Sequence, residues 1–299
     1  MAMVMGLVLV AITGWSQGRV AVFSVGLDMV KVTVSVEDKA GRNVRDLTAD
    51  DFQIKEDGRP QQIKLFARAY DPGENDALTL DLAILFDTSQ SMIDVLKLSQ
   101  QAAVRFLDAI PRARDLLVVF FDQDIRISRY DSEHQQGLFA QIMDSEGGGN
   151  TALRDAIATS LSRIQAGQGR SAMVIFTDGE DSFSRISVGE LMAAVESSPV
   201  TIYPVAFEGA PINKDSAARA RAFLDHLAKT TGGRVFHPRS ARELPEVYQT
   251  ILEDLEGQYV LGYIPDNPRQ DRGFRKLKIK VHRKGVKVRH RVGYLPPRS

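Results

Sequence analysis

Between residues 78 and 255, short apolar runs alternate with longer segments whose apolar residues have helical spacing. The first run, residues 78–86 (LTLDLAILF), is almost continuously apolar, which is typical of a strand covered on both faces in a parallel sheet. Further strands are expected at residues 116–121, 172–177, 201–207 and 234–236. Helices are expected at residues 92–110, 135–143, 152–164, 188–197, 217–230 and 241–255. This alternation predicts an α/β fold with a doubly wound, mostly parallel sheet.

Both flanks of this block have the period of β-strands. Alternate residues from Val30 to Val36 are valines separated by polar residues, the pattern of a strand with one buried face. Residues 52–54 and 63–66 repeat it, and Asp57-Gly58 between them predicts a hairpin turn. Beyond Gly257, strands are expected at residues 259–263, 276–281 and 287–289.

Neither flank has enough strands to bury a core alone. We therefore expect the chain ends, residues 19–75 and 258–299, to pair in one small β-sandwich-like domain. The α/β domain, residues 76–257, would be inserted in it.

The first residues form an uncharged apolar run, Met1 to Trp15 (MAMVMGLVLVAITGW). It is shorter than the roughly 20 residues that a membrane-spanning helix needs. We interpret residues 1–18 as the remnant of a signal peptide, with an N-terminal strand as the alternative. This interpretation predicts a protein that is secreted or resides in the periplasm or cell envelope, without a stable membrane span.

Composition removes several classes of site. The chain has no cysteine, which excludes disulfides, thiolate zinc sites and a cysteine nucleophile. Its five histidines lack zinc-ligand spacing, and no nucleophile elbow or phosphate loop is present. The 38 basic and 38 acidic side chains cancel, so the whole molecule gives no reason to expect nucleic acid as a partner.

Charge is nevertheless unevenly distributed. Residues 266–299 carry twelve basic and two acidic side chains, so the remainder of the chain has a net charge of −10. We interpret the basic stretch as a solvated strand face whose lysines discourage pairing at a sheet edge. An anionic glycan, a lipid surface or nucleic acid would be the alternative ligand of that face.

Oxygen donors gather after two of the expected strands and before one helix. They lie in Asp87-Thr88-Ser89-Gln90-Ser91, in Gly147-Gly148-Gly149-Asn150-Thr151 and in Thr177-Asp178-Gly179. In an open α/β sheet, ligands bind beyond the carboxyl ends of the strands. Carboxylates and hydroxyls without softer donors suit Mg²⁺, with Mn²⁺ or Ca²⁺ as alternatives.

The first of these loops has competing interpretations. Asp87, Ser89 and Ser91 are two residues apart, so their side chains can converge on one ion. An EF-hand loop is excluded, because Met92 and Leu98 stand where glycine and glutamate are required. An aspartyl nucleophile of a phosphotransferase would usually want a second carboxylate at position 89. Alternatively, Asp87 is only a helix N-cap.

Together, Asp87-x-Ser89-x-Ser91, Thr151 and Asp178 resemble the metal-ion-dependent adhesion site (MIDAS) of von Willebrand factor type A (VWA) domains. The resemblance covers roughly residues 78–255 and implies a Rossmann-like VWA fold. It also implies that both carboxylates and the three hydroxyls bind the ion, some through water, while an acidic side chain of a partner protein completes the site. The wider chain, including the 258–263 segment (QYVLGY), is similar to bacterial secreted proteins with this domain.

Four residues form the expected rim of the site: Gln90, Asn150, Glu180 and Asp181. Gln90 stands where the family often has glycine. Glu180 and Asp181, with Asp155, are otherwise expected to be solvated helix or loop residues.

Three hypotheses follow. The first is a non-enzymatic module that binds an exposed Asp or Glu of a partner protein through Mg²⁺. The second is a metal-dependent phosphohydrolase with Asp87 as the nucleophile. The third is a structural scaffold with an empty site, in which the β domain is the functional part.

Overall fold

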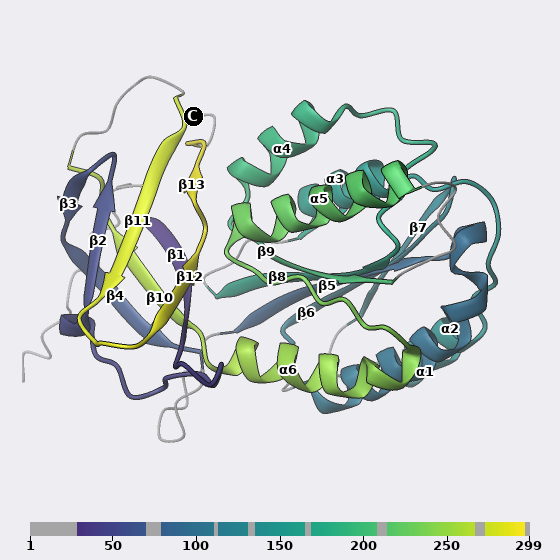
Figure 1. The fold of residues 1–299 in the computed structure, drawn as a ribbon, viewed down its shortest axis with the longest axis horizontal. Helices are drawn as coiled ribbons and strands as arrows, with labels where there is room; N and C mark the ends of the chain where they lie inside the picture. Colours follow the sequence, from purple (N-terminus) through teal and green to yellow (C-terminus); the bar gives the residue numbers. More distant parts are fainter. Residues whose placement is uncertain are drawn as a thin grey trace, which may run out of the picture.

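A five-stranded sheet with helices on both faces forms one half of the molecule (Figure 1). The computed structural model describes residues 29–69, 79–110, 113–130, 135–164, 169–207, 214–266 and 273–296, so the expected signal peptide lies outside them. The sheet order is β7-β6-β5-β8-β9. Its strands are β5 (Leu80–Asp87), β6 (Asp115–Phe121), β7 (Ile125–Tyr130), β8 (Arg170–Thr177) and β9 (Thr201–Ala206). Only β7 is antiparallel to its neighbour, so the predicted doubly wound, mostly parallel sheet is confirmed.

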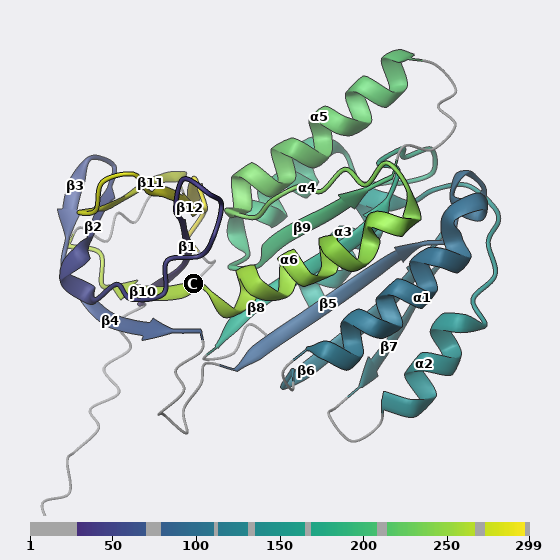
Figure 2. The same ribbon diagram turned by 60° about the horizontal axis from the view of Figure 1, so that its bottom comes forward.

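The helices divide between the two faces of this sheet, as Figure 2 also shows. One face packs against α1 (Ile93–Ala109), α2 (Gln135–Met143) and α6 (Leu244–Glu256). The other packs against α3 (Leu153–Arg163), α4 (Val188–Ser197) and α5 (Lys214–Thr231). Short 3-10 helices precede α1 (Gln90–Met92) and α6 (Ala241–Glu243). The central strands are therefore apolar on both sides, which explains the continuous apolar runs in the sequence.

The two chain ends form a β-sandwich beside this domain (Figure 1). One sheet has the order β12-β1-β10-β4 and the other β13-β11-β2-β3. The N-terminal part supplies β1 (Val30–Glu37), β2 (Phe52–Glu56), β3 (Arg59–Gln61) and β4 (Ile63–Arg68), and a 3-10 helix, Ala49–Asp51, precedes β2. The C-terminal part supplies β10 (Tyr259–Tyr263), β11 (Arg275–Val281), β12 (Lys287–His290) and β13 (Gly293–Tyr294). Pairing of β1 with β10 and of β2 with β11 confirms that both ends share one core.

Several details differ from the sequence-based expectation. β7 was not expected, because its short sequence is only partly buried: Ile125 and Ile127 pack on one core and Tyr130 on the other, while Arg126 and Arg129 are exposed. Residues 234–236 form a single bridge between Phe236 and Val205 rather than a strand. The next residue but one, Pro238, has no amide hydrogen with which to extend a ladder.

The turn at Asp57-Gly58 is a hairpin turn, but its second strand differs from the expected one. Both residues have positive φ, 47° and 82°, as a two-residue hairpin turn requires. The turn joins β2 to β3, whereas β4 crosses to the other sheet and pairs with β10. The hydrophobic pattern alone did not show that Gln62 separates two strands of different sheets.

The basic strand β11 also has a different position from the expected one. It lies between β13 and β2 in its sheet and is not an edge strand. The expectation of an edge is therefore wrong for the β11 lysines, whereas β12, from the same basic stretch, is an edge strand of the other sheet and carries the exposed Lys287.

A buried polar network joins the two domains. The Asp254 carboxylate, near the end of α6, accepts hydrogen bonds from Tyr203 Oη at 2.7 Å and from Arg289 Nη2 of β12. Arg289 also contacts Glu37 Oε1 of β1 at 2.8 Å. On the other side, Gln258 Nε2 donates to Tyr203 Oη at 2.7 Å. The network therefore runs from the central sheet through α6 into the sandwich.

Among the described residues, no helix is long and apolar enough to cross a membrane.

His290 predicts a dependence of stability on pH. Its Nε2 accepts a hydrogen bond from the Ile279 amide at 3.1 Å, and its Nδ1 faces the Arg291 carbonyl oxygen at 2.6 Å. The ring must therefore be neutral with the proton on Nδ1, and burial lowers the pKa of His290 from its ordinary value of 6.5. Because the folded-state pKa is the lower one, this stabilisation is present above the ordinary pKa and is lost as the pH falls through the folded-state pKa.

We expect the free energy of unfolding to decrease between about pH 7 and pH 5. In His290→Gln this decrease should be smaller, as measured by urea denaturation at each pH. His226, exposed on α5, is the matched control, and His226→Gln should keep the decrease. Equal pH profiles for the parent and His290→Gln would contradict the assignment.

Candidate functional site

Three loops meet at the carboxyl edge of the central sheet. The first follows β5 (residues 87–91), the second precedes α3 (147–151) and the third follows β8 (177–184). Two backbone hydrogen bonds join the first and second loops: Gln90 N to the Gly149 oxygen at 3.1 Å, and Gly148 N to the Thr88 oxygen at 2.7 Å. Gly149 has φ of +79°, a conformation that a side chain would strain.

The third loop is bonded to both of the others. Thr177 Oγ1 donates to Asp87 Oδ2 at 2.6 Å, and Gly179 N donates to Thr177 Oγ1 at 3.0 Å. Thr151 N donates to Ser182 Oγ at 3.1 Å, and Ser182 N returns a bond of 2.9 Å to the Thr151 oxygen. The three segments predicted to supply oxygen donors are thus brought together.

Asp87 is the most deeply buried acidic group of the site. Its side chain ends the central strand, the residue is 1% exposed, and Oδ1 accepts a hydrogen bond of 3.0 Å from Ser89 N. Among the described residues, no basic side chain pairs with it. Burial therefore raises the pKa of Asp87 to about 7, and the nearby charge of Asp178 acts in the same direction. A buried negative charge without a nearby cation is energetically costly, and a bound metal ion would lower that cost.

The remaining predicted ligands lie on the same three loops and are buried to different extents. Ser89 is buried, Ser91 is exposed, and their hydroxyl oxygens lie 3.3 Å apart. Thr151 is 5% exposed, and Asp178 is half-buried with Oδ1 accepting from Glu180 N at 3.0 Å. These two carboxylates and three hydroxyls fit a hard divalent ion that keeps some of its waters. No group of three or more His, Asp or Glu is placed to hold a metal within the described part of the chain. An ion here would thus depend on the hydroxyls.

The expected rim residues differ in their availability. Gln90 and Asn150 are exposed, while Glu180 Oε1 accepts a hydrogen bond of 2.8 Å from Ser216 Oγ of α5. Gly179 allows this close approach of α5, because a Cβ there would lie 2.9 Å from Leu224 Cδ1.

Two acidic residues expected to be solvated are instead bonded to backbone amides. Asp181 Oδ2 accepts from Arg154 N in the first turn of α3 at 2.8 Å, and Ser184 Oγ donates to the same oxygen. Asp155 accepts from the amides of Arg185 and Ile186 at 3.0 Å each. The expectation of solvated side chains is therefore wrong for both. The third loop folds over the start of α3 and brings these carboxylates to backbone amides, which the sequence alone does not show.

A fourth loop, after β6, supports the first one, and the sequence analysis missed it. Thr88 Oγ1 and Arg126 Nη2 both donate to Asp122 Oδ2, at 3.2 and 2.8 Å. Burial acts to raise the pKa of Asp122, but the Arg126 guanidinium, the Asp124 amide and the Thr88 hydroxyl together hold that pKa below its ordinary value. The available signal was an acid directly after a buried strand, as in Asp87.

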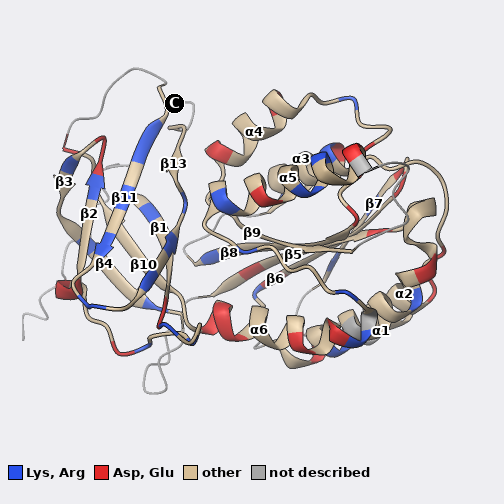
Figure 3. Cartoon of the chain, in the orientation of Figure 1, with Lys and Arg blue, Asp and Glu red and all other residues tan. Residues whose placement is uncertain are grey.

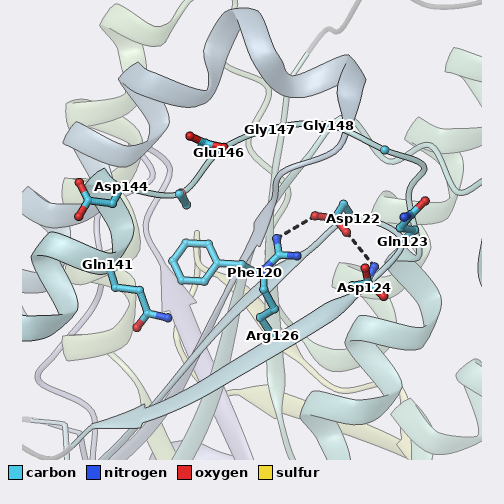
Figure 4. Close-up of a pocket in the computed structure, with 12 residues that line it drawn as sticks. Phe120, Asp122, Gln123, Asp124, Arg126, Gln141, Asp144, Glu146, Gly147 and Gly148 are labelled. Carbon is cyan, nitrogen blue, oxygen red and sulfur yellow. Dashed lines mark hydrogen bonds and ion pairs between the residues drawn. The ribbon is translucent and has the colours of Figure 1, made fainter.

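A pocket of about 730 Å³ lies beside this support (Figure 4). It is bordered by Arg126, Gln141 and the Gly147–Gly149 segment. Asp124, Asp144 and Glu146 also line it, and only the Asp122–Arg126 ion pair contributes a basic group. The pocket adjoins the second loop, so a partner bound at the three loops would cover or enter it.

The comparisons with known proteins agree with this architecture. The family model of the von Willebrand factor type A domain matches residues 81–250, which is more than half of the chain. The protein belongs to the von Willebrand factor type A family. No curated protein sequence matches it.

Solved structures share the fold at low sequence identity. The pilus adhesin SpaC from Lactobacillus rhamnosus GG has 10% identity and a TM-score of 0.51, over 82% of this chain and 48% of that one. A von Willebrand factor type A protein from Catenulispora acidiphila has 12% identity and a TM-score of 0.49, over 91% and 74%. BatB from Bacteroides thetaiotaomicron has 17% identity and a TM-score of 0.46, over 58% and 97%. These similarities concern the fold alone.

Proposed function

We propose that the protein is a non-enzymatic, divalent-metal-dependent protein-binding module. An Mg²⁺ ion, with Mn²⁺ or Ca²⁺ as alternatives, would be held in a complete MIDAS by Asp87, Ser89, Ser91, Thr151 and Asp178. The observation that carries the proposal is the buried Asp87 carboxylate, which has no basic partner among the described residues where the three loops meet.

The ion would supply a positive charge that attracts a carboxylate of the partner protein. The two protein carboxylates balance the charge of a divalent ion, and the hydroxyls add no negative charge. The ion therefore does not carry excess negative charge around it and can still bind an external carboxylate. The exposed side chains of Gln90 and Asn150 would contact the partner around that acid. Asp181 has another role, because its carboxylate holds the start of α3. As a protein-binding module of this family, the chain would act outside the cytoplasm, secreted or in the cell envelope, as the name of the SpaC adhesin also suggests.

The phosphohydrolase hypothesis is less well supported. Both oxygens of Asp87 accept hydrogen bonds, one from Thr177 and one from Ser89 N, and the residue is 1% exposed. Each oxygen keeps a lone pair that a small ion could use, but a nucleophile must be approached by the phosphorus of a much larger substrate, and a residue 1% exposed does not allow that approach. Turnover of a phosphate ester that disappears in Asp87→Asn would favour this alternative.

Calorimetric titration with Mg²⁺ tests the proposal. We expect the parent to bind one ion, and the double variant Asp87→Ala with Asp178→Ala to show no binding while circular dichroism remains unchanged. The matched control is Asp144→Ala with Glu146→Ala, which removes two acids beside the second loop and should keep Mg²⁺ binding. Equal Mg²⁺ uptake by the Asp87/Asp178 variant and the parent would reject the site. With the site established, capture of a partner protein should require Mg²⁺ and be reversed by chelator.

A further inference from the structure

One face of the sandwich carries a group of lysines that the proposed function does not use. We call Lys55, Lys276, Lys278 and Lys280 the lysine face. Along β11, Leu277 and Ile279 point into the sandwich core, so the three lysines of this strand project outward and are exposed. On β2, Lys55 lies directly opposite Lys278 in the antiparallel register. Figure 3 shows these basic segments side by side on β11 and β2.

No acidic group among the described residues pairs with these four lysines. Glu56 of β2 is buried on the opposite side of the sheet and accepts a hydrogen bond of 2.8 Å from Tyr294. Asp57, in the turn after β2, accepts from the Lys276 backbone amide at 3.0 Å. Like charges directly opposite each other on neighbouring strands destabilise a sheet. On the side of β11 away from β2, β13 pairs with Arg275 and Lys276, and His290 Nε2 accepts from the Ile279 amide, so this side is covered by the chain and the lysines are not needed to block it. An external anion bound at this face would reduce the electrostatic repulsion between the lysines.

An exposed aromatic side chain lies at one end of this face. Phe274 precedes β11 and is 40% exposed. Its ring covers Gly293 of β13, where an added Cβ would lie 2.4 Å from Phe274 Cζ, and Gly293 is the partner of Lys276 in the register. Phe274 is thus on the same side of the sheet as the lysines. Binding at a membrane interface is strengthened by electrostatic attraction to anionic lipids and by burial of apolar surface, and this face offers a group for each.

We propose that the lysine face and Phe274 bind the surface of a membrane that contains anionic phospholipids. The lysines would contact headgroup phosphates, and Phe274 would enter the boundary between headgroups and acyl chains. Sequence-independent binding of single-stranded nucleic acid would need several aromatic platforms. Phe274 is the one exposed large apolar side chain that the described residues place beside this sheet.

Cosedimentation of the full chain with lipid vesicles tests this proposal. We expect binding to vesicles of phosphatidylcholine and phosphatidylglycerol in equal parts, weaker binding at high salt, and none to phosphatidylcholine alone. Each lysine near an anionic surface contributes about fivefold to affinity, so Lys276→Gln with Lys278→Gln and Lys280→Gln should weaken binding roughly a hundredfold. Phe274→Ser should weaken it further at equal charge.

The matched control changes three exposed lysines elsewhere, Lys64, Lys97 and Lys229, to glutamine. This control has the same net charge as the Lys276/Lys278/Lys280 variant and should bind vesicles like the parent. Equal losses of vesicle affinity in the two triple variants would overturn the proposal. Binding of the parent to heparin or to an oligonucleotide, but not to anionic vesicles, would also overturn it. The Asp87→Ala/Asp178→Ala variant should bind vesicles normally, so the test is independent of the metal site.

Discussion

Asp87→Asn should make the metal-free protein more stable and abolish its response to Mg²⁺. In the parent, the Asp87 charge is buried without a basic partner among the described residues, and burial raises its pKa from 3.8 to about 7. A shift of that size corresponds to a destabilisation of about 4 kcal/mol at a pH above both values. An asparagine has no charge to bury, and the Thr177 hydroxyl, which now donates to Asp87 Oδ2, can instead accept from the new amide.

The measurement is thermal unfolding at pH values above 7, in EDTA and in Mg²⁺. We expect the Asn variant to unfold at a higher temperature than the parent in EDTA, and Mg²⁺ to raise the unfolding temperature of the parent only. Because a raised carboxyl pKa destabilises only where the group ionises, the difference in EDTA should shrink as the pH falls towards the ordinary pKa.

Asp178→Asn is the control that separates the two effects. Asp178 is half-buried, and its Oδ1 accepts one backbone hydrogen bond, from Glu180 N. This variant should therefore change stability in EDTA less than Asp87→Asn does, and yet lose the response to Mg²⁺. If Asp87→Asn destabilised the metal-free protein and Mg²⁺ still raised its unfolding temperature, the assignment of the ion to Asp87 would be wrong.

The meeting of the three loops could be predicted from the sequence because of where the loops lie. Asp87 and Asp178 each follow a continuously apolar strand, and neighbouring parallel strands end at the same edge of a sheet. The hydrogen bonds that hold the loops in place could not be predicted. Thr177 bonds to Asp87 across 90 positions, and such a contact leaves no periodic pattern in the chain.

The roles of Asp155 and Asp181 show the same limit. Both are charged residues beside turn-forming segments, for which solvent exposure is the usual outcome. In the structure the third loop folds back over the start of α3, and these carboxylates accept its amides and those of the helix. A prediction from local composition uses only neighbouring residues in the chain. Here the hydrogen-bond partners come from a segment about 30 positions away.

In the sandwich, strand periodicity predicted which residues are buried but not which strands are neighbours. The valines of β1 and the apolar residues of β11 do form the core. However, β4 leaves the hairpin for the other sheet, and the two-residue strand β13 pairs with the start of β11, at Arg275 and Lys276. A two-residue strand such as β13 is too short to show the alternating pattern of a strand. The sequence therefore could not show which segment lies beside the β11 lysines.

Replacing Asp254 should be the most destabilising single change at the junction of the two domains. The residue is 2% exposed, and its carboxylate accepts hydrogen bonds from Tyr203 and Arg289. In Asp254→Ala the Arg289 guanidinium would keep Glu37 as its one acidic partner among the described residues, and Tyr203 would lose its acceptor in a fully buried position. Breaking a buried ion pair by removing one partner typically costs about 3–5 kcal/mol.

Urea denaturation followed by two probes would measure this cost and its extent. Because Arg289 and Glu37 belong to the sandwich while Tyr203 belongs to the central sheet, the loss should loosen the contact between domains as well as each domain. The parent should therefore unfold in one transition, and Asp254→Ala in a broader or divided one at lower urea. Glu253→Ala is the matched control. The neighbouring Glu253 is exposed and its side chain accepts a hydrogen bond from Gln249 on the same helix, so this change should alter stability by less than about 1 kcal/mol. Equal midpoints for the two variants would mean that the network does not couple the domains.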